Sequence, residues 1–322
     1  VRPRKFSHIN GNIVEIPTVV HVRLLIETIS KLSEVNMEMT ATFTLYQAWT
    51  DERLARPGSK IDLVLPDDLI ANVWKPDIAI QGAIKTNEHR TTQSNHIMRI
   101  CPNGDVHYWA KLTSIISCQM YFNNFPLDRQ KCQISLYSFG FYSDEVWLYW
   151  HKQPNAFYQS SVDTLASFRL EHYSQSVESV RYCPNQEEVD VVAIDSRSTV
   201  VSNNKNGSSS SDPSKNYSTK LNKPPVSVLP NHLSEAVKKC VAKNYAVHEF
   251  EFERYFISVF FVSYLPAQVM VILGGLSTFI DPKSSPARVG MGITSVLTIS
   301  TVIQGLNFHP RISGKCIIQF DI

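Results

Sequence analysis

The sequence has almost no net charge, because 31 lysines and arginines nearly balance 29 aspartates and glutamates and leave a formal charge of +2. Proteins that bind nucleic acid usually carry a clear basic excess, so this balance gives no reason to expect a nucleic-acid partner. The basic start of the chain, Val1–Lys5, is too short to change that conclusion. We expect it to be a solvated terminus.

Catalytic motifs are also missing, since no HExxH, GxSxG, P-loop or GxGxxG pattern occurs. His107 is a lone histidine in a strand pattern and is expected to be structural. The sequence therefore predicts no enzyme, no catalytic residue, no metal site and no cofactor. Heptad runs and internal repeats are not evident either, so neither a coiled coil nor a repeat protein is indicated.

Charge is absent from two long windows near the end of the chain. Tyr255–Ile280 has 26 residues without a charge, and about 20 apolar residues suffice to cross a membrane as a helix. A buried core helix is the alternative, but such helices are rarely so long and apolar all round. After a short polar hinge, Val289–Leu306 adds 18 uncharged residues, about 27 Å of helix. We expect two membrane helices, over residues 255–280 and 286–306.

The second window carries a stripe of small and polar residues. Its members follow a spacing of four, three, four and three: Gly290, Thr294, Leu297, Thr301 and Gln304. This spacing places them on one helical face, which lipid would not favour. Two interpretations remain: a packing seam of small residues between helices, or a pore lining in which Leu297 is a hydrophobic gate.

The rest of the chain predicts β structure. Short runs rich in β-branched and aromatic residues alternate with turn signals, a pattern typical of a sandwich or barrel. The runs are Thr40–Tyr46, His107–Cys118 and Gln133–Phe139, and the turns are Pro66–Asp68, Pro102–Asp105 and Asn123–Asn124. Glu249–Glu253 alternates with period two and ends at Arg254, so a strand is expected to lead directly into the first membrane helix.

Six cysteines allow many pairings, and spacing alone does not select one. Cys118 and Cys132 enclose 13 residues, and a bridge there would stabilise the fold by about 3 kcal/mol. Within that segment, the aromatic residue before proline in Phe125–Pro126 favours a cis peptide bond.

Three motifs together resemble one family. The stretch CQMYFNNFPLDRQKC resembles the signature loop of the Cys-loop pentameric ligand-gated ion channels, and Trp74–Asp77 resembles their WxPD motif. PARVGMGITSVLT is similar to the pore helix of the anion-selective branch, which contains the GABA type A, glycine and glutamate-gated chloride channels. The resemblance runs from about Arg2 to the last residue with one insertion.

The resemblance implies an all-β, immunoglobulin-like extracellular sandwich followed by α-helical transmembrane segments, with five subunits around one pore. Residues 1–254 would form the ligand-binding sandwich. Residues 255–322 would form a partial transmembrane domain with helix 255–280, pore helix 286–306 and a linker, 307–322, toward a third helix. The family has two further helices and a cytoplasmic loop, so a subunit truncated after the second membrane helix is expected.

The implied function is a neurotransmitter-gated chloride channel in the plasma membrane, at a postsynaptic site, with the N-terminal domain outside the cell. Its partners would be a small-molecule neurotransmitter, chloride, membrane lipid and other subunits of a homo- or hetero-pentamer. Two alternatives remain: a truncated, non-conducting, modulatory or dominant-negative subunit, or a membrane-anchored ligand-binding ectodomain.

The family's agonist site lies between subunits and is lined by aromatic side chains that attract ammonium groups. Ser138–Phe141 resembles the second principal-face loop, and Tyr182 resembles the start of the third. Several positions depart from the family pattern, including the place of a carboxylate-binding arginine, which is Tyr46 here. The ligand-binding positions implied are Phe139, Phe141, Tyr182, Tyr137, Tyr46 and Thr44. A simple homomeric glutamate or glycine receptor is therefore not expected.

The resemblance also assigns the pore and its coupling to the sandwich. Ala287 stands where cation-selective relatives have glutamate, and Arg288 would form an anion-attracting ring, with a lipid-interface anchor as the alternative. The pore-lining positions are Ala287, Arg288, Gly290, Thr294, Leu297, Thr301 and Gln304. The coupling positions are Phe125, Pro126, Asp128, Arg254 and Arg311.

The family resemblance further implies disulfides Cys118–Cys132 and Cys183–Cys240. The second would span a low-complexity insertion at about 184–235, which contains glycosylation sequons at Asn206 and Asn216. An intron read as coding sequence would look the same.

Overall fold

The computed structural model describes residues 1–9, 12–151, 156–157, 165, 167–182, 190–200, 241–276, 279 and 285–305. Its strands are β1 (Lys5–Ile9), β2 (Asn12–Ile16), β3 (Thr18–Ser33), β4 (Glu38–Thr50), β5 (Leu63–Leu65), β6 (Ile78–Ile80), β7 (Ala83–Glu88), β8 (His96–Ile100), β9 (Asp105–Ser117), β10 (Arg129–Ser138), β11 (Val146–Trp150), β12 (Ala156–Phe157), β13 (Phe168–Tyr182), β14 (Asp190–Val200) and β15 (Val241–Arg254). Its helical elements are η1 (Glu52–Leu54), α1 (Asp67–Ile70), α2 (Phe256–Val259), the π-helical η3 (Phe260–Tyr264), α3 (Leu265–Leu276) and α4 (Ser285–Gly305).

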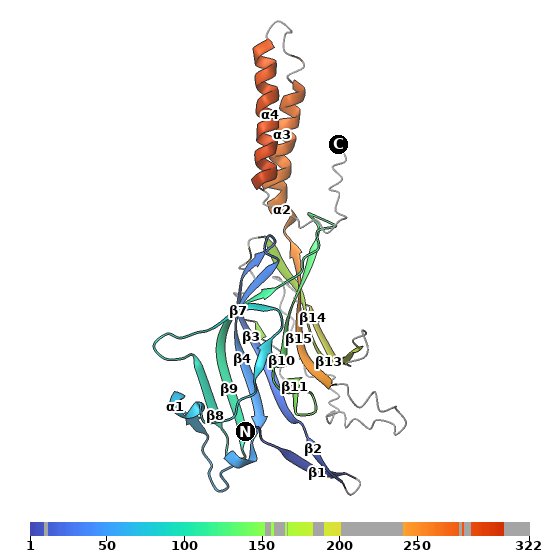
Figure 1. Cartoon of the computed structure of the whole chain (residues 1–322). Coiled ribbons are helices and arrows are strands. Elements are labelled where there is room, and N and C mark those ends of the chain that lie inside the picture. The colour runs from blue at the N-terminus through green and yellow to red at the C-terminus, as the bar shows by residue number, and fades with distance from the viewer. Residues whose placement is uncertain are drawn as a thin grey trace, which may run out of the picture.

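Two sheets form the predicted β-sandwich (Figure 1). The larger has the strand order β11-β3-β4-β9-β8-β5, with β12 also paired to β3 and β7 to β9. The smaller has the order β14-β13-β15-β10-β6. Fully buried side chains from both sheets, such as Leu24, Phe43, Ile134 and Phe250, belong to one hydrophobic core. Alternation along the strands places these residues inward and their neighbours outward.

In strand β15 the even-numbered residues from Asn244 to Arg254 are all buried, and from His248 onward buried and partly exposed residues alternate strictly. The predicted strand Glu249–Glu253 lies within it, with its three glutamates on the outer face. After Tyr255 the chain enters α2 directly, so the expected strand-to-helix junction is confirmed.

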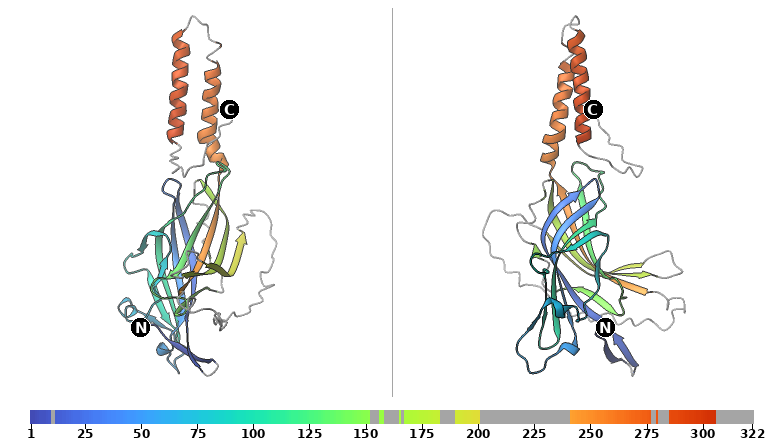
Figure 2. Two further views of the ribbon diagram at one scale, coloured as in Figure 1. Left: turned by 45° about the vertical axis from the view of Figure 1, so that its right-hand side comes forward. Right: turned by 60° about the vertical axis from the view of Figure 1, so that its left-hand side comes forward.

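The helices form a hairpin beyond one end of the sandwich, and β1 and β2 lie at the other end (Figures 1 and 2). The first expected helix, 255–280, corresponds to α2, η3 and α3, and the second, 286–306, corresponds to α4. Over the described part of the chain, no helix combines enough length with enough apolar character to cross a membrane. The membrane assignment therefore stays a prediction.

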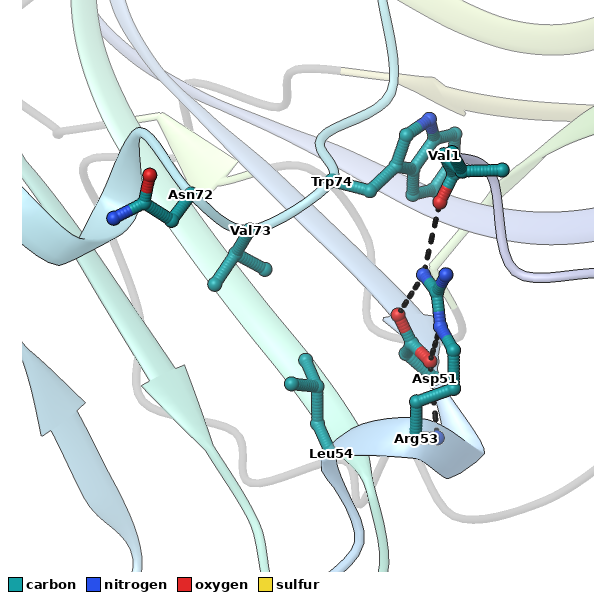
Figure 3. Close-up of a pocket in the computed structure, with 7 residues that line it drawn as sticks. All are labelled: Val1, Asp51, Arg53, Leu54, Asn72, Val73 and Trp74. Carbon is teal, nitrogen blue, oxygen red and sulfur yellow. Dashed lines mark hydrogen bonds and ion pairs between the residues drawn. The ribbon is translucent and has the colours of Figure 1, made fainter.

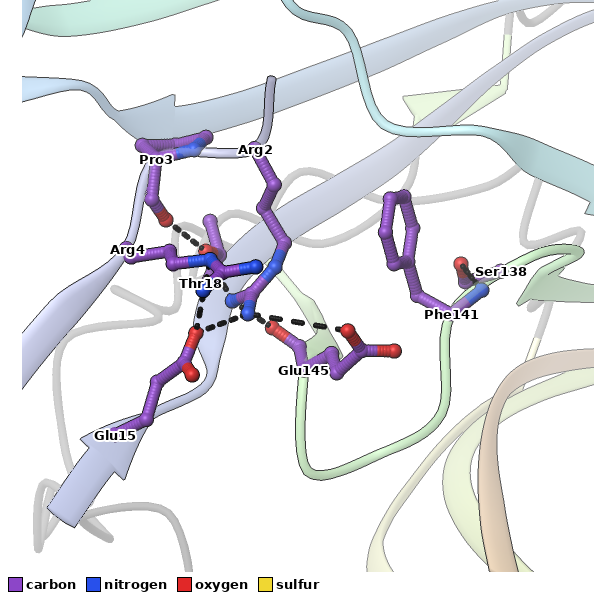
Figure 4. A network of polar contacts seen from close by, with 8 residues as sticks. All are labelled: Arg2, Pro3, Arg4, Glu15, Thr18, Ser138, Phe141 and Glu145. Atoms are coloured by element: carbon purple, nitrogen blue, oxygen red, sulfur yellow. Dashed lines mark hydrogen bonds and ion pairs between the residues drawn. The ribbon is translucent and has the colours of Figure 1, made fainter.

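The start of the chain is only partly solvated, because Val1 and Arg4 are exposed but Arg2 and Pro3 are buried, so the expectation was wrong for Arg2 and Pro3. Arg2 is buried, and its guanidinium lies between Glu15, Glu145 and Thr18 (Figure 4). It donates to the Glu145 carbonyl at 2.8 Å and forms an ion pair with Glu15. These partners are distant in sequence, so the pattern of the first five residues could not reveal them.

Local features of the turns agree with the sequence in most places. Gly104, at φ +89°, forms the turn that joins β8 to β9, a conformation that glycine adopts readily. Phe125–Pro126 is cis, and Cys118–Cys132 is bonded, as expected. Pro66–Asp68 instead begins a helical turn, α1, because two aspartates favour a helix N-terminus and Ile70 buries itself in the core.

Candidate functional site

An aromatic cluster lies on the outer face of the smaller sheet. Tyr137 of β10 and Tyr245 of β15 stand directly opposite each other, with ring centroids 5.3 Å apart. The Tyr182 hydroxyl, from the end of β13, lies 2.9 Å from that of Tyr245. Burial, followed by the hydrogen bond to Tyr182, raises the pKa of Tyr245, so its hydroxyl stays protonated at neutral pH. Three strands thus bring two predicted ligand-binding residues, Tyr137 and Tyr182, together.

Lys243 lies in the middle of this cluster. Its Nζ is 5.3 Å from the centroid of the Tyr137 ring, 5.9 Å from that of Phe139 and 5.7 Å from that of Tyr142. The same atom donates to the carbonyl oxygen of Phe139 at 2.7 Å and that of Ser138 at 3.4 Å. Distances of this order favour cation–π attraction, so the cluster holds a cation supplied by its own chain.

The loop Ser138–Phe141 is shaped by Asp77 of the WKPD motif. Asp77 accepts a hydrogen bond from Ser138 Oγ at 2.5 Å and another from the backbone of Gly140. A Cβ at Gly140 would lie 2.9 Å from the Asp77 carboxylate, which explains the glycine. Two motifs identified separately in the sequence are therefore one structural unit.

Phe139 and Phe141 point to different environments. The Phe139 side chain is 70% exposed beside the aromatic cluster. Phe141 packs toward Trp74 at 6.4 Å, and Trp74 in turn contacts Trp49 at 5.8 Å. The structure therefore brings Phe139, but not Phe141, to the cluster around Lys243.

A small hollow of about 160 Å³ lies beside Trp74 (Figure 3). Asp51 and Arg53 line it as an ion pair, and Arg53 also donates to the Val1 carbonyl at 2.9 Å. The hydrogen bond from Arg53 lowers the pKa of Asp51. The Val1 carbonyl is therefore tied to η1 through Arg53, although Val1 itself is exposed, and no pattern in the first five residues predicts this contact.

The other two predicted ligand-binding positions, Thr44 and Tyr46, lie on β4 in the larger sheet. Thr44 donates to Glu27 at 3.1 Å, and Glu27 forms an ion pair with Lys111. Within one chain they belong to a different sheet from Lys243.

Tyr46 is nearly buried under neighbouring rings. Its hydroxyl lies 2.7 Å from His107 Nδ1, and its ring centroid is 5.1 Å from that of Trp109. Burial raises the pKa of Tyr46, so the phenol remains neutral. His107 makes a structural contact here.

A buried ionic network lies where the sandwich meets the helices. Arg254 donates to Asp128 through Nε at 2.6 Å and Nη2 at 3.0 Å, and to Glu34 through Nη1 at 2.7 Å. Its guanidinium carbon is 5.0 Å from the centroid of the Phe125 ring and 4.5 Å from that of Phe168. Burial alone would lower the pKa of Arg254, but the bonds to Asp128 and Glu34 outweigh burial and raise it.

This network joins three parts of the chain. Asp128 lies within the loop closed by Cys118 and Cys132, Glu34 lies in the β3–β4 turn, and Arg254 ends β15. The structure therefore brings three predicted coupling residues into contact, Phe125, Asp128 and Arg254. Pro126 follows Phe125 through the cis peptide bond, and Arg311 lies outside the described residues.

On α4, the predicted stripe and the packing face differ. Gly290, Thr294, Leu297 and Thr301 are exposed, and Leu297 is 63% exposed. The partly buried positions of the helix include Arg288, Met291 and Ser295. A Cβ at Gly274 of α3 would lie 3.6 Å from Ser295 Oγ, which locates the α3 contact there.

Hydroxyls along the stripe donate to the helix itself, for example Thr294 to the Gly290 carbonyl at 2.9 Å. Ala287 and Gln304 belong to α4, but their side chains lie outside the described part. The structure does not describe Cys183, Cys240, Asn206 or Asn216, so the second disulfide and the two glycosylation sites stay predictions.

Sequence reasoning missed Lys243, Tyr245 and Tyr142. A signal for the first two was available, because Lys243 and Tyr245 alternate on the outward face of the same strand as Glu249. Tyr142 follows the second loop and joins the cluster only through the turn that Asp77 shapes.

Comparison with known proteins gives a consistent result. A family model described as the neurotransmitter-gated ion-channel ligand binding domain matches residues 5–205. The gamma-aminobutyric acid receptor subunit rho-1 of Mus musculus is 28% identical over 296 residues, which cover 91% of this chain and 50% of the relative. The rho-3 subunit of Rattus norvegicus is 29% identical over 301 residues, 92% of this chain and 53% of the relative. The chain thus spans about half the length of the curated relatives it matches.

Proposed function

Because the chain belongs to the family of the neurotransmitter-gated ion-channel ligand-binding domain, we propose that it is a subunit of a neurotransmitter-gated chloride channel. Agonist binding between subunits would open a pore lined by α4. The N-terminal sandwich would lie outside the cell and the helices in the plasma membrane. The curated relatives are gamma-aminobutyric acid receptor subunits, so that compound is the first agonist to test.

The Arg254 network is the observation that carries this proposal. It holds the end of β15, the strand that carries Lys243 and Tyr245, against the disulfide-closed loop and directly before α2. A sandwich that only displayed a ligand would not need a buried ion pair at its helical end. A ligand that favours one position of β15 would shift the helices through this contact, because coupling is a difference in binding between two states.

The placement of the ligand-binding positions supports a site between subunits. Tyr137 and Tyr182 lie on the smaller sheet, whereas Thr44 and Tyr46 lie on the larger one. A small ligand that contacts both sets must therefore bridge two chains. Thr44 and Tyr46 are already engaged with Glu27 and His107, and no arginine occupies either position. This favours a heteromer in which another subunit supplies the complementary half.

The helical hairpin would be the membrane part. α2, η3 and α3 follow one another without a break from Phe256 to Leu276, about 32 Å of helix at 1.5 Å per residue. Large apolar side chains on this run and on α4 are exposed in the single chain, among them Ile257, Phe261, Ile272 and Val296. Lipid and neighbouring subunits would cover them.

Chloride selectivity rests on α4. The helix begins Ser285–Pro–Ala–Arg288 and contains no acidic residue, so no carboxylate ring can form along it. Five copies of Arg288 and of the positive helix end would raise the local potential for anions. The stripe from Gly290 to Thr301 faces away from α3, which supports a pore lining over a seam with α3.

Expression of the chain alone and with a full-length rho-1 subunit, followed by recording of currents evoked by gamma-aminobutyric acid, tests the proposal. We expect currents from the pair whose reversal potential follows the chloride gradient and whose agonist sensitivity differs from that of rho-1 alone. A reversal potential that follows sodium would exclude chloride selectivity. Suppression of the rho-1 current without a change in sensitivity would support the non-conducting alternative.

A further inference from the structure

Lys243 occupies the place in the aromatic cluster where an ammonium ligand would gain cation–π attraction. Three rings surround its Nζ at 5.3–5.9 Å, and two carbonyl oxygens accept its N–H groups. A second ammonium brought into the same cluster would meet a like charge and would displace contacts that are already made. The cluster is therefore unsuited to a ligand recognised by its ammonium group.

The registers between β15 and its two neighbouring strands place Lys243 in the cluster, so its position is not one of many that a surface side chain could adopt. Its Cα pairs with Val180 of β13, and two residues later Tyr245 pairs with Tyr137 of β10. Lys243 and Tyr245 share the outer face, so the lysine side chain lies over the Tyr137 ring. The backbone of Ser138 and Phe139 supplies the two carbonyls, and Asp77 fixes that loop.

The charge of Lys243 is not balanced by an ion pair among the described residues. Glu178 of β13, which pairs with Tyr245 on this face, accepts a hydrogen bond from Ser176 Oγ at 3.2 Å. Glu249 and Glu253, further along β15, pair with Lys131 and with Arg129 and Arg169. An ammonium has three N–H donors, and the two carbonyls account for two of them. An acidic group arriving from solvent past the exposed Phe139 would meet a donor and a positive charge that has no ion pair within the described part of the chain.

We propose that Lys243 is a built-in cation of the agonist site and that this site takes a small ligand through its carboxylate, with the aromatic rings contacting the rest of the ligand. This inference rests on the proposed function, because it assigns the cluster to the principal half of that site. In ammonium recognition by an aromatic box the ligand supplies the cation, whereas here the protein supplies the cation and the ligand supplies the carboxylate.

The first experiment observes Lys243 directly in the purified full chain. Reductive methylation with ¹³C-formaldehyde keeps the charge of each lysine and gives each a methyl resonance, and Lys243→Arg identifies the one from Lys243. We expect that resonance to be shifted upfield by the ring currents of Tyr137, Phe139 and Tyr142. A resonance at the position of solvent-exposed lysines would overturn the proposal.

The second experiment separates the two ligand classes with two probes: glutarate, which has carboxylates and no ammonium, and choline, which has an ammonium and no carboxylate. Titration of the wild-type chain should move the Lys243 resonance with glutarate and leave it in place with choline. In Lys243→Met, followed by tyrosine fluorescence, glutarate binding should weaken at least tenfold and choline should now bind.

Lys131→Met is the matched control, because Lys131 is an exposed lysine on the outer face of the adjacent strand. It should leave both titrations unchanged. Choline binding to the wild-type chain as tightly as to Lys243→Met would overturn the proposal, as would undiminished glutarate binding in that variant. The titrations measure binding and do not depend on channel current. If they give the expected results but no current can be recorded, only the proposed function is contradicted.

Discussion

Strand β15 carries two cations that both lie among aromatic rings, and they differ in almost every other respect. Arg254 is on the core face, is 6% exposed and bonds to two carboxylates. Lys243 is on the outer face, is half-buried and bonds to two carbonyls. The planar guanidinium suits a fixed bidentate pair, whereas an ammonium with neutral partners can exchange them. The strand thus has one end built for a permanent contact and one end able to accept another molecule.

Among the substitutions compared along β15, we expect the largest loss of stability at Arg254. Arg254→Met leaves the Asp128 carboxylate buried without its cation, and we expect the free energy of unfolding to fall by about 3–5 kcal/mol. Chemical unfolding followed by tryptophan fluorescence measures this. Arg129→Met is the control, because Arg129 is half exposed and its ion pairs should contribute less than about 1 kcal/mol. Equal losses in the two variants would contradict the buried network.

The disulfide-closed loop that contains Asp128 should also affect the Arg254 end. Replacing Cys118 and Cys132 together by alanine removes a link across 14 positions, and we expect a loss of about 3 kcal/mol in the free energy of unfolding. Cys101→Ala, at a described cysteine outside that bridge, should change it little. An unchanged midpoint in the double variant would show that the loop is held by its other contacts.

Between the two cations, His248 should make the strand sensitive to acid. Burial lowers the pKa of His248 from 6.5 to about 3, so below pH 6.5 the unfolded chain binds a proton that the folded chain does not. Its contribution to stability is complete above pH 6.5 and is lost as the pH falls from 6.5 toward 3. From pH 7.5 to pH 5 we expect a loss of about 2 kcal/mol.

The measurement compares unfolding of the wild-type chain and His248→Phe at both pH values. The ring of phenylalanine suits neighbours such as Phe250 and Tyr173, and it cannot take up the proton. The free energy of unfolding should depend on pH more steeply in the wild-type chain than in His248→Phe, and this difference reports His248 alone. An identical pH dependence of the unfolding free energy in the two proteins would mean that His248 does not stay neutral inside the fold.

The smallest effect is expected at Lys243. Lys243→Met removes the charge but keeps most of the aliphatic stem, and contacts between exposed cations and rings contribute about 0.5–1 kcal/mol. The same unfolding experiment should therefore show a loss below about 1 kcal/mol, close to that of Lys131→Met. A loss as large as that of Arg254→Met would mean that Lys243 is a structural anchor, and the contrast between the two ends of β15 would disappear.

The sequence could predict features that are local or repeated. The alternation of Glu249–Glu253 is enough to predict a strand, and the uncharged run after Arg254 is enough to predict a helix. The Cys118–Cys132 bridge followed from the resemblance and not from spacing. Thr44, Tyr46 and Tyr137 were identified by position alone, and the structure adds which neighbours each one contacts.

Contacts between distant segments could not be predicted. Arg2 looked solvated because its partners, Glu15 and Glu145, are far along the chain. Lys243 gained its surroundings from the registers of β10, β13 and β15, which no single stretch encodes. Phe139 and Phe141 differ in direction because Asp77 bends the loop between them.

Strand β15 also sets a rule for how this chain can vary in length. It pairs on both sides, and every second residue from Asn244 to Arg254 points into the core. One residue added or removed between Lys243 and Arg254 would turn Phe250 and Phe252 outward and their glutamate neighbours inward. The stretch expected to be a low-complexity insertion at about 184–235 contains strand β14 (Asp190–Val200), which pairs with β13, so that expectation was wrong for residues 190–200. The number of residues between β14 and β15 can change without altering the count between the two cations. Insertions and deletions are therefore expected to be tolerated between β14 and Val241 and not within β15.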